Sequence, residues 1–197
     1  MKLAAKAPRS GPERFERLYT ASPDPWGYRD SAYEREKYAR TLTALPARPL
    51  GVVLELGCSI GVFTERLASC CERVVAVDFS PLALQLAGAR LAKRGNVRLA
   101  QSSFPEQTPP GPWDVVVCSE VLYYLDEPML RAAVSWFAGQ LQEGACVLVV
   151  SWRGEGASEP LRGDDVHDLL AVELAAWHAL DDRQPGYRLD RFDGDAR

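Results

Sequence analysis

From position 52 onward, short apolar runs alternate with stretches of helical periodicity, and this alternation limits the possible folds more than any other feature. Each run is short enough for a strand that is buried on both faces. Successive strand–helix units predict an α/β fold with a mostly parallel sheet and helices on both faces. The five expected strands are VVLELG (52–57), RVVAVD (73–78), NVRLAQ (96–101), WDVVVCS (113–119) and ACVLVVSW (145–152).

The C-terminal segment adds two more strand-like runs, a weak one around 177–180 and YRLDRFD at 187–193. A short turn joins them, so they are expected to pair antiparallel. The chain therefore predicts seven strands, one of which is reversed. Asp164 or Asp165 is expected to cap a short helix that precedes this hairpin.

The first ~30 residues are polar and rich in proline and arginine, and we expect them to form a loose arm. Ser31 and Glu34 have the spacing of a capping box that begins a helix, and Pro46 ends it. The length of 197 residues suits one domain. In this interpretation residues 1–45 cover a site, and residues 46–197 form the core.

Composition excludes several classes of protein. A net charge of −4 and the lack of basic runs disfavour nucleic-acid binding. Five cysteines without a C-x-x-C pair and two unclustered histidines predict reduced thiols and no metal site. The sequence contains no secretory signal and no apolar run that could cross a membrane, so the cytoplasm is the expected compartment.

The loop after the first strand, ELGCSIG (55–61), allows more than one interpretation. A dinucleotide fingerprint fits poorly, because Ser59 and Val62 occupy two of its glycine positions. The loop also matches G-x-S-x-G, in which Ser59 would be the nucleophile of a serine hydrolase, with His167 or His178 downstream. Against the hydrolase, no glycine-rich oxyanion loop precedes the motif.

The second strand ends in Asp78. A carboxylate at this place can accept hydrogen bonds from both hydroxyls of a ribose. The alternative is that Asp78 only caps the helix that begins at Pro81.

Taken in order, these motifs resemble those of class I S-adenosylmethionine-dependent methyltransferases over about residues 52–152. That class implies a Rossmann-like fold. A narrower resemblance is to the nodulation-protein S family, which implies N-methylation of an amino-sugar in a chitooligosaccharide. It rests on DPW (24–26), YERE (33–36), ELGCSIGVFTERLA (55–68) and EVLYYL (120–125).

The resemblance implies a set of contacts to S-adenosylmethionine, or to its product S-adenosylhomocysteine, at the ends of the first four strands. These positions are Glu55, Gly57, Cys58, Ser59, Gly61, Asp78, Phe79, Ser103, Phe104, Ser119 and Glu120. Two of them depart from the usual pattern. Ser59 replaces the middle glycine, and Ser103 replaces an acid that usually contacts the adenine amino group.

Glu120, Tyr124 and His167 are the candidates for a catalytic base, because an ammonium acceptor must lose a proton before it can attack. Each has a structural alternative: Glu120 bonded to loop backbone, Tyr124 in a helix core, and His167 exposed or capping. Tyr123 is expected to pack.

The acceptor is expected to contact Trp26, Tyr33, Tyr124, Trp152 and Arg153. The N-terminal arm would complete this acceptor side and leave cofactor binding unaffected, although Trp26 could simply hold the arm down.

The function expected from these residues is methylation of a small-molecule or oligosaccharide amine, without nucleic-acid or membrane partners. O-methylation of a small metabolite, serine hydrolysis and a non-catalytic nucleoside-binding module are the alternatives.

Overall fold

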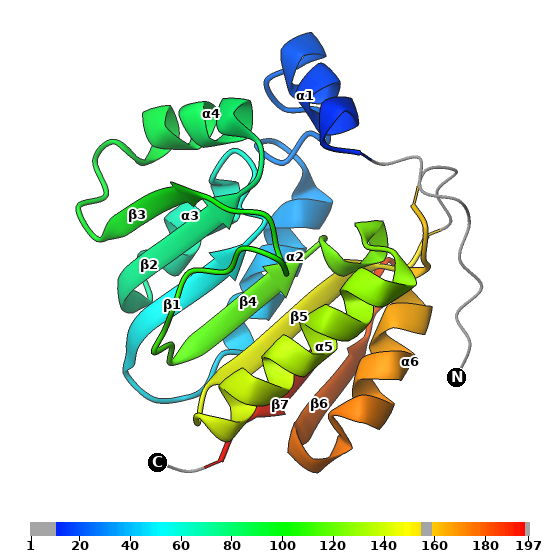
Figure 1. Cartoon of the computed structure of the whole chain (residues 1–197). Helices are drawn as coiled ribbons and strands as arrows, with labels where there is room; N and C mark the ends of the chain where they lie inside the picture. The colour runs from blue at the N-terminus through cyan, green and yellow to red at the C-terminus, as the bar shows by residue number, and fades with distance from the viewer. Residues whose placement is uncertain (1–10, 155–158, 196–197) are drawn as a thin grey trace. The chain divides into compact units, whose positions relative to one another are not determined.

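The computed structural model describes residues 11–154 and 159–195 (Figure 1). Within these ranges seven strands form a sheet in the order β3-β2-β1-β4-β5-β7-β6. The described strand pairs are parallel except those that β7 makes with β5 and β6. The expected α/β class with one reversed strand is confirmed.

Two compact units make up the described chain, residues 11–114 and 115–195. In the first unit β1, β2 and β3 run parallel, so their carboxyl ends meet at one edge. The elements of this unit are α1 (Pro12–Ala21), α2 (Ala32–Thr43), β1 (Leu50–Leu56), α3 (Val62–Leu67), β2 (Cys71–Asp78), α4 (Pro81–Leu91) and β3 (Val97–Gln101).

The turn from β1 into α3 depends on Gly61, which caps α3 with a φ of 77°. A Cβ atom at this position would lie 2.9 Å from Cδ1 of Leu91 and 3.2 Å from Cβ of Ala87, both in α4. A glycine is therefore required both for the backbone conformation and for the close approach of α4. Ser80 caps α4 by accepting from the Ala83 N–H at 3.0 Å, as its sequence predicts.

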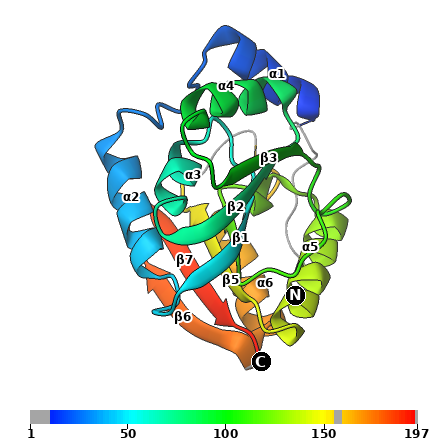
Figure 2. The ribbon, with the colours of Figure 1, turned by 90° about the vertical axis from the view of Figure 1, so that its left-hand side faces the viewer.

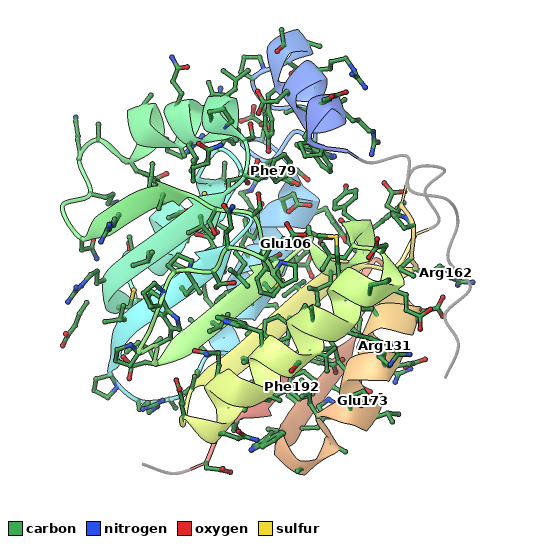
Figure 3. All side chains as sticks on the ribbon, in the orientation of Figure 1. Phe79, Glu106, Arg131, Arg162, Glu173 and Phe192 are labelled. Atoms are coloured by element: carbon green, nitrogen blue, oxygen red, sulfur yellow. The ribbon has the colours of Figure 1, made fainter. Side chains whose placement is uncertain are left out.

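In the second unit β4 and β5 are parallel, and β7 lies antiparallel between β5 and β6. Helices α5 and α6 run beside each other, and Arg131 of α5 forms an ion pair with Glu173 of α6 at 3.9 Å (Figure 3). The elements are β4 (Val115–Ser119), η1 (Leu122–Tyr124), α5 (Glu127–Gln142), β5 (Cys146–Trp152), α6 (Gly163–Glu173), η2 (Ala175–Trp177), β6 (His178–Arg183) and β7 (Tyr187–Asp193).

The N-terminal arm differs from the expected loose segment, because residues 12–21 form helix α1. Pro12 stands in its first turn, and Phe15 and Tyr19 lie four residues apart on one buried face. Figure 2 shows α1 beside α4, which it contacts. This tertiary packing explains a helix that the polar composition concealed. Residues 1–10 of the arm lie outside the described ranges.

The expected cap of α6 is wrong. Arg162 occupies the N-cap position without a side-chain bond, and Asp164 and Asp165 lie in the first helical turn. There the carboxylates still favour the positive end of the helix. The capping box at α2 is half confirmed: Ser31 accepts from the Glu34 N–H at 3.2 Å, but the Glu34 carboxylate turns to Lys37.

Residue 45 lies inside the compact unit of residues 11–114. Tyr38 of α2 stacks on Phe63 of α3 with ring centroids 5.0 Å apart, so α2 belongs with β1–β3. A single domain in which residues 1–45 cover a site stays a prediction. In the described part of the chain, no helix has the length and apolar character needed to cross a membrane.

Candidate functional site

The loop after β1 is held in a tight curve by the end of β2. The N–H groups of Gly57 and Cys58 both donate to the Val77 carbonyl, at 2.8 and 2.9 Å. Gly57, Ser59 and Gly61 all have left-handed backbones, with φ of 73°, 50° and 77°. For a serine this conformation costs about 1 kcal/mol, which the surrounding contacts must offset.

Asp78, at the end of β2, is the anchor of this loop. Its Oδ2 accepts from the Ser59 N–H and its Oδ1 from the Ser80 N–H, both at 2.9 Å. The side chain is buried, and burial raises its pKa, while bonds from the backbone N–H groups of Ser80, Ser59 and Phe79 lower it. A carboxylate offers about four acceptor positions, so these bonds still leave capacity for a ribose hydroxyl. Asp78 does not cap α4 itself, as the alternative from the sequence would have it. Ser80 is the cap of α4, and Asp78 only accepts from the N–H of Ser80.

Glu55 of β1 lies behind the loop and is almost fully buried. Burial raises its pKa to about 8; the Thr64 hydroxyl partly offsets this, and the nearby Asp78 charge adds to it. Its Oε2 is buried and makes no hydrogen bond. A cationic group such as an ammonium at this oxygen would favour the ionised carboxylate and so oppose the rise in its pKa.

The hydroxyl of Ser59 bonds to a tyrosine rather than to a histidine. Its Oγ lies 2.6 Å from the Oη of Tyr19 in α1. Both histidines instead contact Asp190 in the other unit. The contacts therefore give no support to a hydrolytic elbow at Ser59. Burial also raises the pKa of the neighbouring Cys58 thiol, so Cys58 is no better a nucleophile.

Helix α1 adds aromatic side chains that sequence reasoning missed. Phe15 meets Phe79 edge-on, with ring centroids 5.3 Å apart, and Figure 3 shows Phe79 beneath α1. Trp26 packs against Tyr19 at 5.5 Å and stacks on Tyr28 at 5.6 Å. Trp26 is only half-buried, but these contacts match its alternative role of holding the arm in place.

The end of β3 supplies smaller polar groups. Ser103 and Phe104 are both half-buried. The buried hydroxyl here belongs to Ser102, which donates to the Gln107 carbonyl. Gln101, which sequence reasoning missed, donates to the Phe79 carbonyl at 3.0 Å and braces that loop.

A buried ion pair lies in α2 next to Tyr33. The Lys37 Nζ is 2.9 Å from Glu34 Oε1, and the two side chains are only 2% and 10% exposed. The ammonium also lies over the ring of Tyr33, 5.2 Å from its centroid. Tyr33 itself is 40% exposed. The pair could have been found from the helical spacing of YEREK, although its burial could not.

In the unit of residues 115–195, Glu120 follows β4 with a left-handed backbone of φ 60°. Its Oε2 accepts from the Tyr123 hydroxyl at 2.7 Å and from the backbone N–H of Trp152 at 2.9 Å. Ser119 and Tyr124 are half-buried beside it in the chain. The structure thus brings together two candidate site residues, Glu120 and Trp152, through the kind of backbone bond that was the structural alternative for Glu120.

The two residues at the end of β5 have different surroundings. The Trp152 indole is 38% exposed and lies so close to Gly154 that a Cβ atom there would collide with it. Arg153 donates to Asp164 at 2.9 Å and to the Gln184 carbonyl at 2.8 Å. Because its guanidinium already has these partners, Arg153 is less suited than Trp152 to contact an acceptor.

His167 is completely buried in α6, so both its expected exposure and its expected capping role are wrong. Its Nδ1 lies 2.6 Å from Asp190 Oδ2, and His178 Nε2 lies 3.1 Å from Asp190 Oδ1. Arg188 also contacts Asp190, at 3.2 Å. Without an exposed ring atom His167 cannot take a proton from an acceptor at the surface. Among the described residues no group of His, Cys, Asp and Glu is arranged to hold a metal ion.

Comparison with known proteins points to one family. A family model described as nodulation protein S (NodS) matches residues 13–156. Nodulation protein S of Rhizobium tropici is 33% identical over 135 residues, which are 68% of this chain and 57% of the relative. The nodulation protein S of Bradyrhizobium diazoefficiens is 32% identical over 134 residues, or 67% of this chain and 64% of that protein. The chain therefore spans less than two-thirds of the length of these curated relatives.

The fold also matches a solved structure. The N-methyltransferase NodS from Bradyrhizobium japonicum WM9, crystallised with S-adenosyl-L-homocysteine, superposes with a TM-score of 0.77. The match covers 93% of this chain and 98% of that one, at 24% identity. The architecture is thus that of class I methyltransferases.

Proposed function

The chain belongs to the nodulation protein S family, and on that premise we propose that it is an S-adenosylmethionine-dependent methyltransferase of a small molecule that carries an amine. The observation that carries this proposal is the anchor at Asp78. A buried carboxylate at the end of β2 fixes a left-handed loop after β1 and keeps acceptor positions for a ribose.

The remaining residues of the first unit suit the other parts of the cofactor. The unpartnered Oε2 of Glu55 would face the ammonium of its methionine part. Phe79 would pack on adenine, with Ser103, Phe104 and the N–H groups around them as polar contacts. Ser59 is small enough for the glycine position it occupies. These are the same residues that the family resemblance implies.

For the acceptor side we propose Glu120, Tyr124 and Trp152 of the second unit. The Glu120 carboxylate accepts from the backbone N–H of Trp152, whose indole is exposed, and a carboxylate charge and a ring face both attract an ammonium. Tyr33, exposed in the first unit, is a further candidate because its ring already accepts a cation.

The cofactor supplies a methyl group bonded to a positively charged sulfur. The protein must deliver the acceptor nitrogen with its lone pair free. We propose that the Glu120 carboxylate binds the ammonium and takes one proton, which leaves a neutral amine and a carboxylic acid. A bound cofactor would supply its methyl group to this lone pair, and the electron pair of the C–S bond would stay on sulfur. Alignment of these atoms is the main source of acceleration.

Nitrogen is favoured over oxygen as the site of methylation. The solved relative is named an N-methyltransferase, and a hydroxyl would need a stronger base than Glu120. We propose an amino-sugar acceptor on the family resemblance, and the cytoplasm as the compartment, where the five free cysteines would stay reduced.

The test uses cofactor with an isotopically labelled methyl group and two matched acceptors, a glucosamine tetramer and its fully N-acetylated form. Mass spectrometry should show one added methyl on the free-amine tetramer and none on the acetylated one. Methylation of both would indicate a hydroxyl acceptor. A protein that neither binds S-adenosylhomocysteine in calorimetry nor transfers a methyl group would overturn the proposal.

A further inference from the structure

Tyr123 sits among packed side chains but directs its hydroxyl to a carboxylate. The residue is only 6% exposed, and its ring centroid lies 4.6 Å from that of Tyr124. Its carbonyl accepts from the Leu161 N–H at 3.2 Å, which fixes the η1 segment. The hydroxyl donates to Glu120 Oε2 at 2.7 Å. Packing therefore accounts for the ring but not for the hydroxyl.

The backbone of Glu120 is held in a conformation that is unfavourable for this residue. Its N–H donates to the Val150 carbonyl at 2.9 Å and extends the β4–β5 pairing by one residue. Immediately after this bond the chain turns left-handed at φ 60°. Backbone strain of this kind persists only where surrounding contacts enforce it.

Two donors from separate elements then fix the Glu120 carboxylate. The Tyr123 hydroxyl comes from η1, and the Trp152 N–H comes from the last residue of β5. Both bond the same oxygen, Oε2, so the carboxylate can neither rotate nor retreat without breaking one of them. The exposed Trp152 indole belongs to the same residue as the second donor.

We propose that Tyr123 is a positioning residue of the methyl transfer, which holds the Glu120 carboxylate in the orientation that receives the acceptor's ammonium group. This inference rests on the proposed function, in which Glu120 binds that group. In this proposal Tyr123 itself would touch neither acceptor nor cofactor. Its hydroxyl acts through Glu120, and its ring anchors that hydroxyl in the packed η1 segment.

The test compares Tyr123→Phe with wild type and with Glu120→Gln. Removing only the hydroxyl should leave thermal stability and S-adenosylhomocysteine affinity close to wild type, the latter within about twofold. With the glucosamine tetramer, kcat should fall about 10- to 100-fold, the effect of losing one bond to a charged group. KM should change by less than about threefold. Glu120→Gln should lower kcat at least as much.

A purely structural role predicts a different pattern. Stability, cofactor affinity and kcat would then fall together in Tyr123→Phe, and this result would overturn the inference, as would an unchanged kcat. Failure of the proposed function is distinguishable, since wild type itself would not methylate the tetramer. If wild type does not methylate the tetramer, a crystal structure of Tyr123→Phe still tests whether Tyr123 positions Glu120. The Glu120 carboxylate should move off the Trp152 N–H, and an unmoved carboxylate would refute the inference.

Discussion

The Tyr19 hydroxyl lies 2.6 Å from the hydroxyl of Ser59 and joins helix α1 to the loop after β1 across 40 residues of sequence. Ser59 is the residue that departs from the usual glycine, so this contact depends on the departure itself. Its N–H is fixed by Asp78 and its hydroxyl by Tyr19. The N-terminal segment is thus attached to the part of the first unit that we propose holds the cofactor.

Tyr19→Phe should loosen α1 and weaken S-adenosylhomocysteine binding by about two- to tenfold, the value of one neutral hydrogen bond. Calorimetry gives the affinity, and amide hydrogen exchange of residues 12–21 reports the helix. Thr20→Ala is the control, because the exposed Thr20 hydroxyl bonds only the Glu16 carbonyl of its own helix. Equal affinities in wild type and Tyr19→Phe would show that the bond from α1 to Ser59 does not contribute to cofactor binding.

Deletion of residues 1–30 is expected to impair cofactor binding as well as methyl transfer. From sequence the arm was expected to complete only the acceptor side. In the structure Phe15 contacts Phe79, and Tyr19 contacts Ser59. S-adenosylhomocysteine affinity of the truncated protein, measured by calorimetry, should therefore fall at least as far as in Tyr19→Phe. If the truncated protein bound S-adenosylhomocysteine with full affinity but no longer transferred a methyl group, the arm would serve only the acceptor side.

Asp78→Asn should weaken S-adenosylhomocysteine binding by about 2–3 kcal/mol, or roughly 30- to 150-fold, because ribose hydroxyls would lose a charged acceptor. Asparagine keeps one oxygen for the Ser59 or Ser80 N–H, so it disturbs the loop less than alanine would. Glu106→Gln, which removes an exposed charge after β3, is the control and should bind as wild type does. Calorimetry that finds no loss in Asp78→Asn would remove Asp78 from the cofactor site.

Much of the fold and of the cofactor side could be predicted because the signals are local in sequence. Gly57, Gly61 and Asp78 stand at strand ends, where the apolar runs stop and the chain must turn. Ser80-Pro81 likewise carries its own helix start. Short-range stereochemistry accounts for most of these features, although Gly61 is also required by the close approach of α4.

The features that were missed depend on residues far apart in the chain. The bond from Trp152 to Glu120 spans 32 residues, and the one from His167 to Asp190 spans 23. Periodicity could not tell that His167 would be buried, since one histidine on a helix fits either face. Likewise α1 owes its formation to aromatic packing against Phe79, which the polar composition of the arm does not reveal.

Glu55→Gln should change how stability depends on pH. The pKa of Glu55 is raised to about 8 in the folded protein, against 4.5 for the ordinary carboxyl. Between these values the unfolded chain loses the proton and the folded chain keeps it, so wild type loses stability as pH rises from 4.5 to 8. The neutral glutamine does not ionise and avoids this loss.

The difference between Glu55→Gln and wild type is therefore expected to be small at pH 4.5 and to reach about 3–5 kcal/mol in favour of the variant above pH 8. Urea unfolding at several pH values measures it. Glu36→Gln, at an exposed position of α2, should show no such trend. A constant difference across the range would mean that Glu55 ionises normally in the folded protein.

Glu34→Gln tests the buried ion pair of α2. Lys37 is 2% exposed and its Nζ lies 2.9 Å from Glu34 Oε1, so neutralising Glu34 removes a counter-charge from a buried ammonium. Breaking a buried pair in this way costs about 3–5 kcal/mol, and a retained amide oxygen should hold the loss near the lower value.

Glu36→Gln serves again as the matched control on the same helix, because an exposed charge contributes little. The double variant Glu34→Gln/Lys37→Met removes both charges and should recover most of the lost stability, because the buried ammonium is then gone as well. Thermal unfolding measures all four proteins. If the double variant were no more stable than Glu34→Gln alone, the loss would come from packing in α2 rather than from the buried Lys37 charge.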